Sequence, residues 1–421
     1  MALEPSQSTP QASSIPPLIR RNTLLLAITQ AVVGAGMQLI PALGAISVVQ
    51  LMGSTTWSGL ATALAGLARM LIAYPVGRVS DSRGRKAGLY IGLLLALFGS
   101  PIIGVGMGAG SFWLFVLGVL VFGAGVGATQ QLRVAAADMY PPQRRSEGIS
   151  FVLMGSLLGA LLSPLIVALA ERLAVEVGQS PLAVAWFIVP LGVAPAFVFT
   201  ALVRPDPKRI ALRLRDYYPQ LPPQNVGQVH SRAHSSFPRR VAIWAGIAAQ
   251  GQMVMLMAMT SLALHQQGCS FNLISLSVTL HVLGMFAFSW PVGWLADRIG
   301  RKPVMLGGLL LSALGALLVG FTGEYASITL GTFLVGLGWC GTYNGATTVV
   351  ADTTAPGERG RAVGILDVWS NGAGTVLPIL AGFLVEGIGI WAIGVAGVLL
   401  LGYPALMVSR LTEVSPGRYE G

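Results

Sequence analysis

Long apolar stretches dominate this chain and restrict what it can fold into. Only 10% of its 421 residues are charged, whereas soluble domains carry about 25%. Twelve stretches reach the length of about 20 residues that a helix needs to cross a bilayer. They fall at 22–47, 57–79, 87–107, 112–137, 147–170, 182–203, 241–264, 271–296, 303–321, 327–350, 361–384 and 388–409. The pattern predicts an all-α membrane protein with 12 transmembrane helices.

The twelve stretches form two sets of six around one longer polar segment. This segment, 204–240, contains prolines, histidines and eight basic residues, and we expect it to be a linker. The predicted organisation is an N-terminal tail, a six-helix bundle, the linker, a second six-helix bundle and a C-terminal tail, at 1–21, 22–203, 204–240, 241–409 and 410–421. Residues 1–19 lack the apolar core of a cleaved signal peptide, so the first stretch is expected to remain as a helix.

Basic residues alternate with the spans and indicate the side on which each loop lies. Of the 26 Lys and Arg, 23 fall in the tails, the linker and every second loop, whereas the opposite loops hold only Arg172. Positively charged loops stay in the cytoplasm, which predicts a multi-pass protein of the plasma membrane, the inner membrane of a bacterium, with both termini cytoplasmic. The net charge of +10 is thereby explained by topology, and no nucleic-acid partner is expected.

One loop motif occurs twice. Residues 75–86 read PVGRVSDSRGRK and residues 291–302 read PVGWLADRIGRK, so seven of twelve positions agree at a shift of 216. A weaker repeat at a shift of 214 pairs Asp138 with Asp352, Pro142 with Pro356, and Pro164 with Pro378. A six-helix unit repeated in the same orientation predicts two pseudo-symmetric bundles related by an axis along the membrane normal.

The G-x-x-x-D-x-x-G-R-K pattern of this loop resembles the signature of the major facilitator superfamily. Its residues are Gly77, Asp81, Gly84, Arg85 and Lys86 in the first copy, and Gly293, Asp297, Gly300, Arg301 and Lys302 in the second. The segment ADMYPPQRR (137–145) and the eighth span are also similar to this family, the latter to a bacterial subgroup. The resemblance implies a twelve-helix transporter rather than an enzyme, without cofactor or metal.

The repeated loop has two interpretations. Asp81 can meet Arg85 or the positive N-terminus of a neighbouring helix, and nearby basic residues can hold anionic lipid headgroups. The resemblance implies that Asp81 latches the two halves against the start of span eleven, with Arg361 and Asp138 in the same cluster. The alternative is a loop that only sets topology. Asp297 is predicted to be the lesser latch, because only Asp81 has a clear partner across the halves.

Few ionisable residues lie inside the spans, where each is costly unless paired or hydrated. Asp367, the one acidic residue clearly within a span, is predicted to carry a coupling proton or to pair with Arg69. The alternative is a buried structural ion pair at the interface of the halves. Arg133 is either structural or, as the resemblance suggests, involved in coupling. His281 is either a proton carrier or a neutral residue packed between helices.

The resemblance also implies that the first and fourth helices of each half line a central cavity. Neutral polar and aromatic residues on these helices are candidates to contact a substrate, unless they serve helix packing instead: Gln30, Gln38, Gln130, Gln250, Gln252, Trp339, Tyr343 and Asn344.

The sequence thus predicts a secondary transporter that moves a small organic molecule by alternating access. The predicted protein is a proton-coupled monomer surrounded by membrane lipids, with export, as in an antiporter for efflux, favoured over import. The chain contains no phosphate-binding loop that would indicate ATP hydrolysis. One alternative is an importer or facilitator for a metabolite or organic anion, with Arg69 or Arg133 as counter-charge. Another is a receptor or scaffold that transports nothing.

Overall fold

The computed structural model of the chain describes residues 15–53, 60–219, 236–267, 269, 271–415 and 418–419. The first half contains α1 (Pro17–Met37), α2 (Leu39–Met52), α3 (Leu60–Arg83), α4 (Arg85–Gly108), α5 (Phe112–Thr129), α6 (Leu132–Met139), η2 (Pro142–Arg144), α7 (Arg145–Val177) and α8 (Pro181–Leu202). The second half contains α12 (Ser236–Gln266), α13 (Phe271–Phe286), α14 (Ser289–Ile299), α15 (Arg301–Phe321), α16 (Tyr325–Asp352), α17 (Arg359–Ile388) and α18 (Trp391–Ser409).

Ten helical segments in the described residues are long and apolar enough to cross a membrane. The other two predicted spans correspond to α1 with α2, and to α16. Both carry many small or polar residues, and 20 of the 28 residues of α16 are buried inside the protein. A buried helix does not face lipid, so it can hold threonine, glycine and asparagine where a lipid-facing helix holds leucine.

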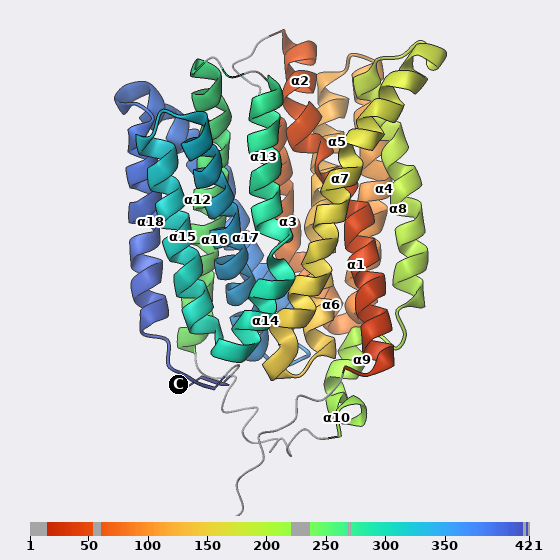
Figure 1. Cartoon of the computed structure of the whole chain (residues 1–421). Helices are drawn as coiled ribbons and strands as arrows, with labels where there is room; N and C mark the ends of the chain where they lie inside the picture. Colours follow the sequence, from red (N-terminus) through yellow and green to blue (C-terminus); the bar gives the residue numbers. More distant parts are fainter. Residues whose placement is uncertain are drawn as a thin grey trace, which may run out of the picture.

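The two halves lie side by side, with α1 to α8 on one side of the molecule and α12 to α18 on the other (Figure 1). Across the boundary α3 packs against α17, and α7 packs against α13 and α14. Corresponding helices of the two halves therefore meet in corresponding pairs, as a repeated unit requires.

Three predicted spans are broken rather than continuous. The breaks fall at Gln38 between α1 and α2, at Gln130 and Gln131 between α5 and α6, and at residues 287–288 between α13 and α14. Irregular backbone at membrane depth is tolerated where it is buried in protein or lines a cavity. Two of the break residues, Gln38 and Gln130, line the cavity described below.

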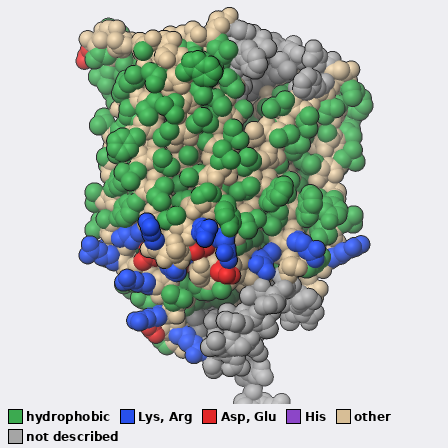
Figure 2. All heavy atoms as spheres, turned by 180° about the vertical axis from the view of Figure 1, so that it is seen from behind, with side chains coloured by type: hydrophobic (Ala, Val, Ile, Leu, Met, Phe, Trp, Pro, Cys, Tyr) green, Lys and Arg blue, Asp and Glu red, His purple; other side chains and the backbone are tan. Residues whose placement is uncertain are grey.

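Charged side chains gather at one end of the molecule, below a broad apolar band (Figure 2). We call this the basic end; it includes the two signature loops, 77–86 and 293–302. Segments outside the bundle also lie there, among them α9 (Pro207–Leu212), α10 (Leu214–Tyr217) and the short strands β1 (Glu413–Ser415) and β2 (Arg418–Tyr419) (Figure 1). Residues 220–235 of the predicted linker fall outside the described residues.

Candidate functional site

A cavity of about 280 Å³ lies between the two halves. Its walls come from α1, α2, α3, α5, α6 and α7 of the first half and from α12, α13, α16 and α17 of the second. Six of the eight predicted cavity residues line it: Gln30, Gln38, Gln130, Gln250, Trp339 and Tyr343. The four predicted intramembrane ionisable residues line it too: Arg69, Arg133, His281 and Asp367.

Gln252 and Asn344 do not line this cavity, unlike the sequence prediction. Gln252 is buried and donates its amide to the carbonyl oxygens of Ser312 and Gly397, at 3.1 and 3.4 Å. Asn344 is buried and donates to Cys340 Sγ at 3.6 Å. Both residues thus have the packing role that was the alternative for each.

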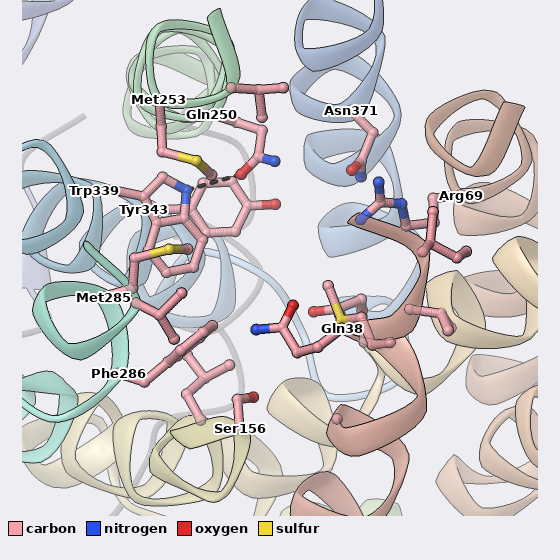
Figure 3. A pocket seen from close by; sticks show the side chains of 18 of the residues that line it. Gln38, Arg69, Ser156, Gln250, Met253, Met285, Phe286, Trp339, Tyr343 and Asn371 are labelled. Carbon is pink, nitrogen blue, oxygen red and sulfur yellow. Dashed lines mark hydrogen bonds between the residues drawn. The ribbon is translucent and has the colours of Figure 1, made fainter. Parts of the chain in front are cut away.

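An aromatic wall faces the cavity from the second half (Figure 3). The rings of Trp339 and Tyr343, one turn apart on α16, stack with centroids 5.0 Å apart and planes 14° apart. Phe286 meets Trp339 edge to face at 6.0 Å. Trp339 Nε1 donates to Gln250 Oε1 at 2.8 Å, which fixes the indole and orients the amide. This wall offers flat apolar surface bordered by hydrogen-bonding groups.

An ion pair between the halves lies at the end of the cavity nearest the basic end. Arg133 Nη2, on α6, donates to both carboxylate oxygens of Asp367, on α17, at 2.8 and 2.9 Å. Tyr343 donates its hydroxyl to Asp367 Oδ1 at 2.7 Å, and Arg133 Nη1 donates to Thr347 Oγ1 at 3.2 Å. Both charged residues are buried. Asp367 is therefore bound as a carboxylate, and its charge is matched by Arg133.

This arrangement corrects one of the two predictions for Asp367. That prediction paired Asp367 with Arg69, but the structure pairs it with Arg133. The ion pair joins the two halves, which is the position that the alternative prediction gave it. The side chain of Arg133 is only 2% exposed and points into the protein.

Arg69, on α3, has no ion pair among the described residues. Its Nε donates to Ala65 O, one turn earlier, at 3.2 Å. The remaining guanidinium nitrogens point into the cavity towards Asn371, across from Trp339 and Tyr343 (Figure 3). Its helix packs closely on α5: a Cβ added at Gly127 would lie 2.9 Å from Arg69 Cα. Close helix packing thus fixes the point from which the Arg69 side chain extends.

His281 lies on α13, in the wall of the cavity. Its Nδ1 is 2.8 Å from the carbonyl oxygen of Thr332 on α16. Because a carbonyl only accepts, Nδ1 carries a hydrogen and donates it to Thr332 O. His281 therefore both joins two helices and lines the cavity, which combines features of its two predicted roles.

A buried charge cluster closes the basic end between α3 and α17. Asp81 accepts from the backbone nitrogens of Gly360 and Arg361 at 2.9 and 2.7 Å, at the start of α17. Arg85 links Asp81 to Asp138, at 2.6 Å to each. We call this set the first latch; its members are Asp81, Arg85, Asp138 and Arg359, whose Nη1 lies 2.7 Å from Asp138.

A second latch repeats this arrangement between α14 and α7. Asp297 accepts from the backbone nitrogens of Ser146 and Glu147 at 3.3 and 2.7 Å, at the start of α7. Arg301 joins Asp297 at 2.8 Å to Asp352 at 3.1 Å. The fourth member, Arg145, pairs with Asp352. Each latch thus places a loop aspartate on the first turn of a helix in the other half, where the helix dipole favours negative charge.

The second latch differs from the sequence prediction, which gave Asp297 no clear partner across the halves. The partner is backbone, and backbone nitrogens carry no sequence signal. Arg361 was also predicted within the first cluster through its charge, but its backbone nitrogen makes the contact while its side chain pairs with Glu358 at 3.0 Å.

The signature glycines allow the halves to touch. A Cβ on Gly77 would lie 2.3 Å from Gly360 O, and one on Gly293 would lie 2.4 Å from Ser150 Oγ. Gly84 and Gly300 both have φ of 101° and precede the first residues of α4 and α15. Carboxylates from outside the bundles cap these helices: Asp206 accepts from Arg85 N and Lys86 N, and Glu413 accepts from Lys302 N, each at 3.1 Å.

Several cavity residues were not predicted, among them Ser156, Met285, Phe286 and Asn371. Asn371 follows Asp367 by one turn, and this spacing was a usable signal. Met285 and Phe286 lie on α13, directly before the break in the predicted eighth span. Within the described residues there is no cluster of His, Cys, Asp and Glu that could hold a metal ion.

Two pseudo-symmetric helix bundles, with a cavity between them and latches at one end, define the class of membrane transporter. The model of the Major Facilitator Superfamily matches residues 26–262 and 241–420. The chain belongs to this superfamily, and it is a multi-pass membrane transporter rather than an enzyme.

Relatives and solved structures agree with this assignment. The chain is 27% identical to the uncharacterized MFS-type transporter YdeG of Bacillus subtilis, over 93% of each chain. It is 26% identical to the riboflavin transporter RfnT of Brucella anthropi, over 88% of this chain and 90% of that one. The proton:xylose symporter XylE has the same fold, with a TM-score of 0.73 at 18% identity over 93% of this chain and 96% of that one.

Proposed function

We propose that this transporter couples the movement of a small organic molecule to the movement of protons by alternating access. The basic end faces the cytoplasm of a bacterium, as the positive-inside bias favours. The latches are broken when the cavity opens to that side. The observation that carries the proposal is the buried pair of Arg133 and Asp367, which joins the two halves at the inner end of the cavity.

The ion pair can act as the coupling element because each half supplies one charge. Opening the basic end separates α6 from α17, and separating a buried pair leaves charges without partners, at a cost of about 3–5 kcal/mol. Protonation of Asp367 removes the negative charge and weakens its bond to Arg133. Proton binding would therefore lower the cost of leaving the closed state.

The chemistry of the cavity supports a planar substrate. The stacked rings of Trp339 and Tyr343 can receive a flat ring system, since aromatic groups favour offset stacking. The Brucella anthropi relative is named as a riboflavin transporter, which makes heteroaromatic compounds the first class to screen.

The test uses purified protein in vesicles with an imposed pH gradient and a panel of labelled planar compounds. We expect a compound to accumulate against its own gradient with the unaltered chain and not with Asp367→Asn. Exchange of labelled for unlabelled compound without a pH gradient should persist in the variant, because asparagine resembles the protonated residue. Glu358→Gln is the control, because Glu358 forms an exposed pair with Arg361 at the same end.

Unchanged gradient-driven accumulation with Asp367→Asn would refute coupling through this residue. The polarity of the gradient also separates the two directions of transport. An antiporter, which would serve export, concentrates the compound in vesicles with an acidic interior. A symporter, which would serve import, concentrates it in vesicles with an alkaline interior.

A further inference from the structure

The charges around the cavity do not balance. Among the described residues that line it, the fully charged ones are Arg69, Arg133 and Asp367. Asp367 is occupied by Arg133 and by the Tyr343 hydroxyl. His281 has its Nδ1 hydrogen on Thr332 O. The permanent charges of the cavity, on two arginines and one aspartate, therefore sum to one positive charge, and the arginine without a carboxylate partner is Arg69.

The geometry separates this charge from the aromatic wall. Arg69 reaches in from the first half, whereas Trp339 and Tyr343 lie on the opposite side of the cavity, on the second half (Figure 3). The bond from Nε to Ala65 O leaves both terminal nitrogens of the guanidinium available. A guanidinium can bind a carboxylate with two parallel hydrogen bonds, while the stacked rings can cover the flat face of an aromatic system.

Amide groups lie between these two features. Gln250 Oε1 is used by Trp339, and its Nε2 has no partner among the described residues. Gln38 extends into the space between the aromatic wall and Arg69 (Figure 3). These amides can hydrogen-bond ring heteroatoms or hydroxyl groups of a bound molecule.

We propose that the cavity binds a planar aromatic or heteroaromatic carboxylate, with its carboxylate on Arg69 and its ring system against Trp339 and Tyr343. This assignment rests on the proposed transport function only in placing the substrate in the cavity. It specifies the substrate as an anion, and Arg69 as the residue that selects for its charge.

Bridging by the substrate has a mechanical consequence. The carboxylate is held by α3 of the first half and the ring by α16 of the second, so a bound molecule draws the two halves together around the cavity. A neutral analogue of the same shape contacts the aromatic wall but loses its charge-assisted bonds to the opposite half.

The test measures binding and needs neither a pH gradient nor transport. Quenching of tryptophan fluorescence in purified protein is titrated with 2-naphthoate and with 2-naphthamide, which has the same ring and no charge. We expect the anion to bind about 10- to 100-fold more tightly, the range expected for hydrogen bonds to a charged group. Arg69→Gln should remove this preference by weakening naphthoate alone, and Arg69→Lys should retain part of it.

Arg78→Gln is the matched control, because Arg78 lies on the same helix and is exposed at the basic end. It should leave both affinities unchanged. Trp339→Leu should weaken the binding of naphthoate and of naphthamide by the same factor. Both affinities are measured by competition with radiolabelled 2-naphthoate.

Three results would overturn the proposal: equal binding of the two probes to the unaltered chain, equal loss of both in Arg69→Gln, or no binding of either. If Arg69→Gln changes proton coupling in vesicles while the probes bind equally, Arg69 is an alternative partner of Asp367 and not a substrate ligand. Failure of coupling through Asp367, with the naphthoate preference intact, would refute the proposed coupling and leave this site standing.

Discussion

The latches and the cavity lie a few residues apart on the same helices. They differ in whether their charged residues have counterparts in the other half. Asp138 of the first latch follows Arg133 of the cavity by five residues on α6. In the latches every charged member has a counterpart of the same type. At shifts of 216 or 214 these are Asp81 and Asp297, Arg85 and Arg301, Asp138 and Asp352, and Arg145 and Arg359.

The cavity shows no such correspondence. At the same shifts its charged residues meet uncharged ones: Arg69 corresponds to Met285, Arg133 to Thr347, and Asp367 to Leu153. Arg133 even donates a hydrogen bond to its own counterpart, Thr347. The difference indicates that closing the basic end requires equal contacts on both sides of the pseudo-symmetry axis. Recognising a molecule that is itself asymmetric requires different contacts from the two halves.

The largest expected effect is the loss of either central latch aspartate. Asp138→Asn removes the ion pair of Arg359 and one of the two ion pairs of Arg85. Asp352→Asn likewise removes the ion pair of Arg145 and one of the two ion pairs of Arg301. Each should destabilise the closed basic end by about 3–5 kcal/mol, because one buried arginine in each latch loses its carboxylate partner. The two losses should agree within about 1 kcal/mol by thermal unfolding.

The closed state can be followed with a pair of cysteines at Ser146 and Thr348, whose hydroxyl oxygens lie 2.9 Å apart across the halves. Disulfide yield at this pair should fall by a similar amount in both latch variants. A large effect of one variant and none of the other would show that the latches are not equivalent.

A second set of variants makes the two halves alike at the inner end of the cavity, where Arg133 pairs with Asp367. Arg133→Thr and Asp367→Leu introduce the residues found at the matching positions of the other half. Each single change should cost up to about 3–5 kcal/mol, because it leaves a buried charge, whereas the double variant should be nearly as stable as the parent chain.

Despite its stability, the double variant should not accumulate substrate in response to a pH gradient. Thermal unfolding together with vesicle accumulation separates these effects. Retention of gradient-driven accumulation would mean that the asymmetric ion pair of Arg133 and Asp367 is not used for coupling.

The glycines at the crossings of the halves test how similar the two contacts are. The three atoms nearest to a Cβ on Gly77 are all backbone, at Gly360 and Arg361. Two of the three nearest to a Cβ on Gly293 belong to the side chain of Ser150, and the third is Ser146 O. Overpacking costs about 1–3 kcal/mol, and we expect Gly77→Ala to be the costlier change, because a backbone relaxes less than a side chain. The cysteine yield at 146 and 348 measures both, and the reverse order would contradict this explanation.

The smallest effect is expected at the surface of the basic end, where the repeat exchanges two charges. Arg144 pairs with Glu147 at 2.8 Å, and the matching positions hold Glu358 and Arg361, paired at 3.0 Å. Glu358→Gln should change the free energy of unfolding by less than about 1 kcal/mol, as for other exposed pairs. A loss comparable to that of Asp138→Asn would show that the outer pair belongs to the latch.

The sequence predicts the fold well because a lipid bilayer requires long apolar helices and basic loops on the cytoplasmic side. Hydropathy and the alternation of basic loops indicated twelve spans, and the repeated signature loop indicated the superfamily. The breaks at Gln38 and Gln130 were not predicted, because a break without proline or a charged residue leaves the hydropathy pattern unchanged.

The site was less predictable, because the rotation of a membrane helix is weakly encoded. Both lipid and protein interior accept apolar side chains, so nothing in the sequence distinguished Gln250, which lines the cavity, from Gln252, which is buried against α15 and α18. The partner of Asp367 likewise depends on which helices meet across the halves. That contact joins residues 234 positions apart.

The cap on α15 has a practical consequence for handling the protein. Glu413 lies beyond the last helix, yet its carboxylate binds Lys302 N at the start of the helix that follows the second signature loop. A truncation before this residue, or an affinity tag that displaces β1, would remove that cap. Transport measured on such a shortened or tagged chain would then describe a molecule with a weakened second latch.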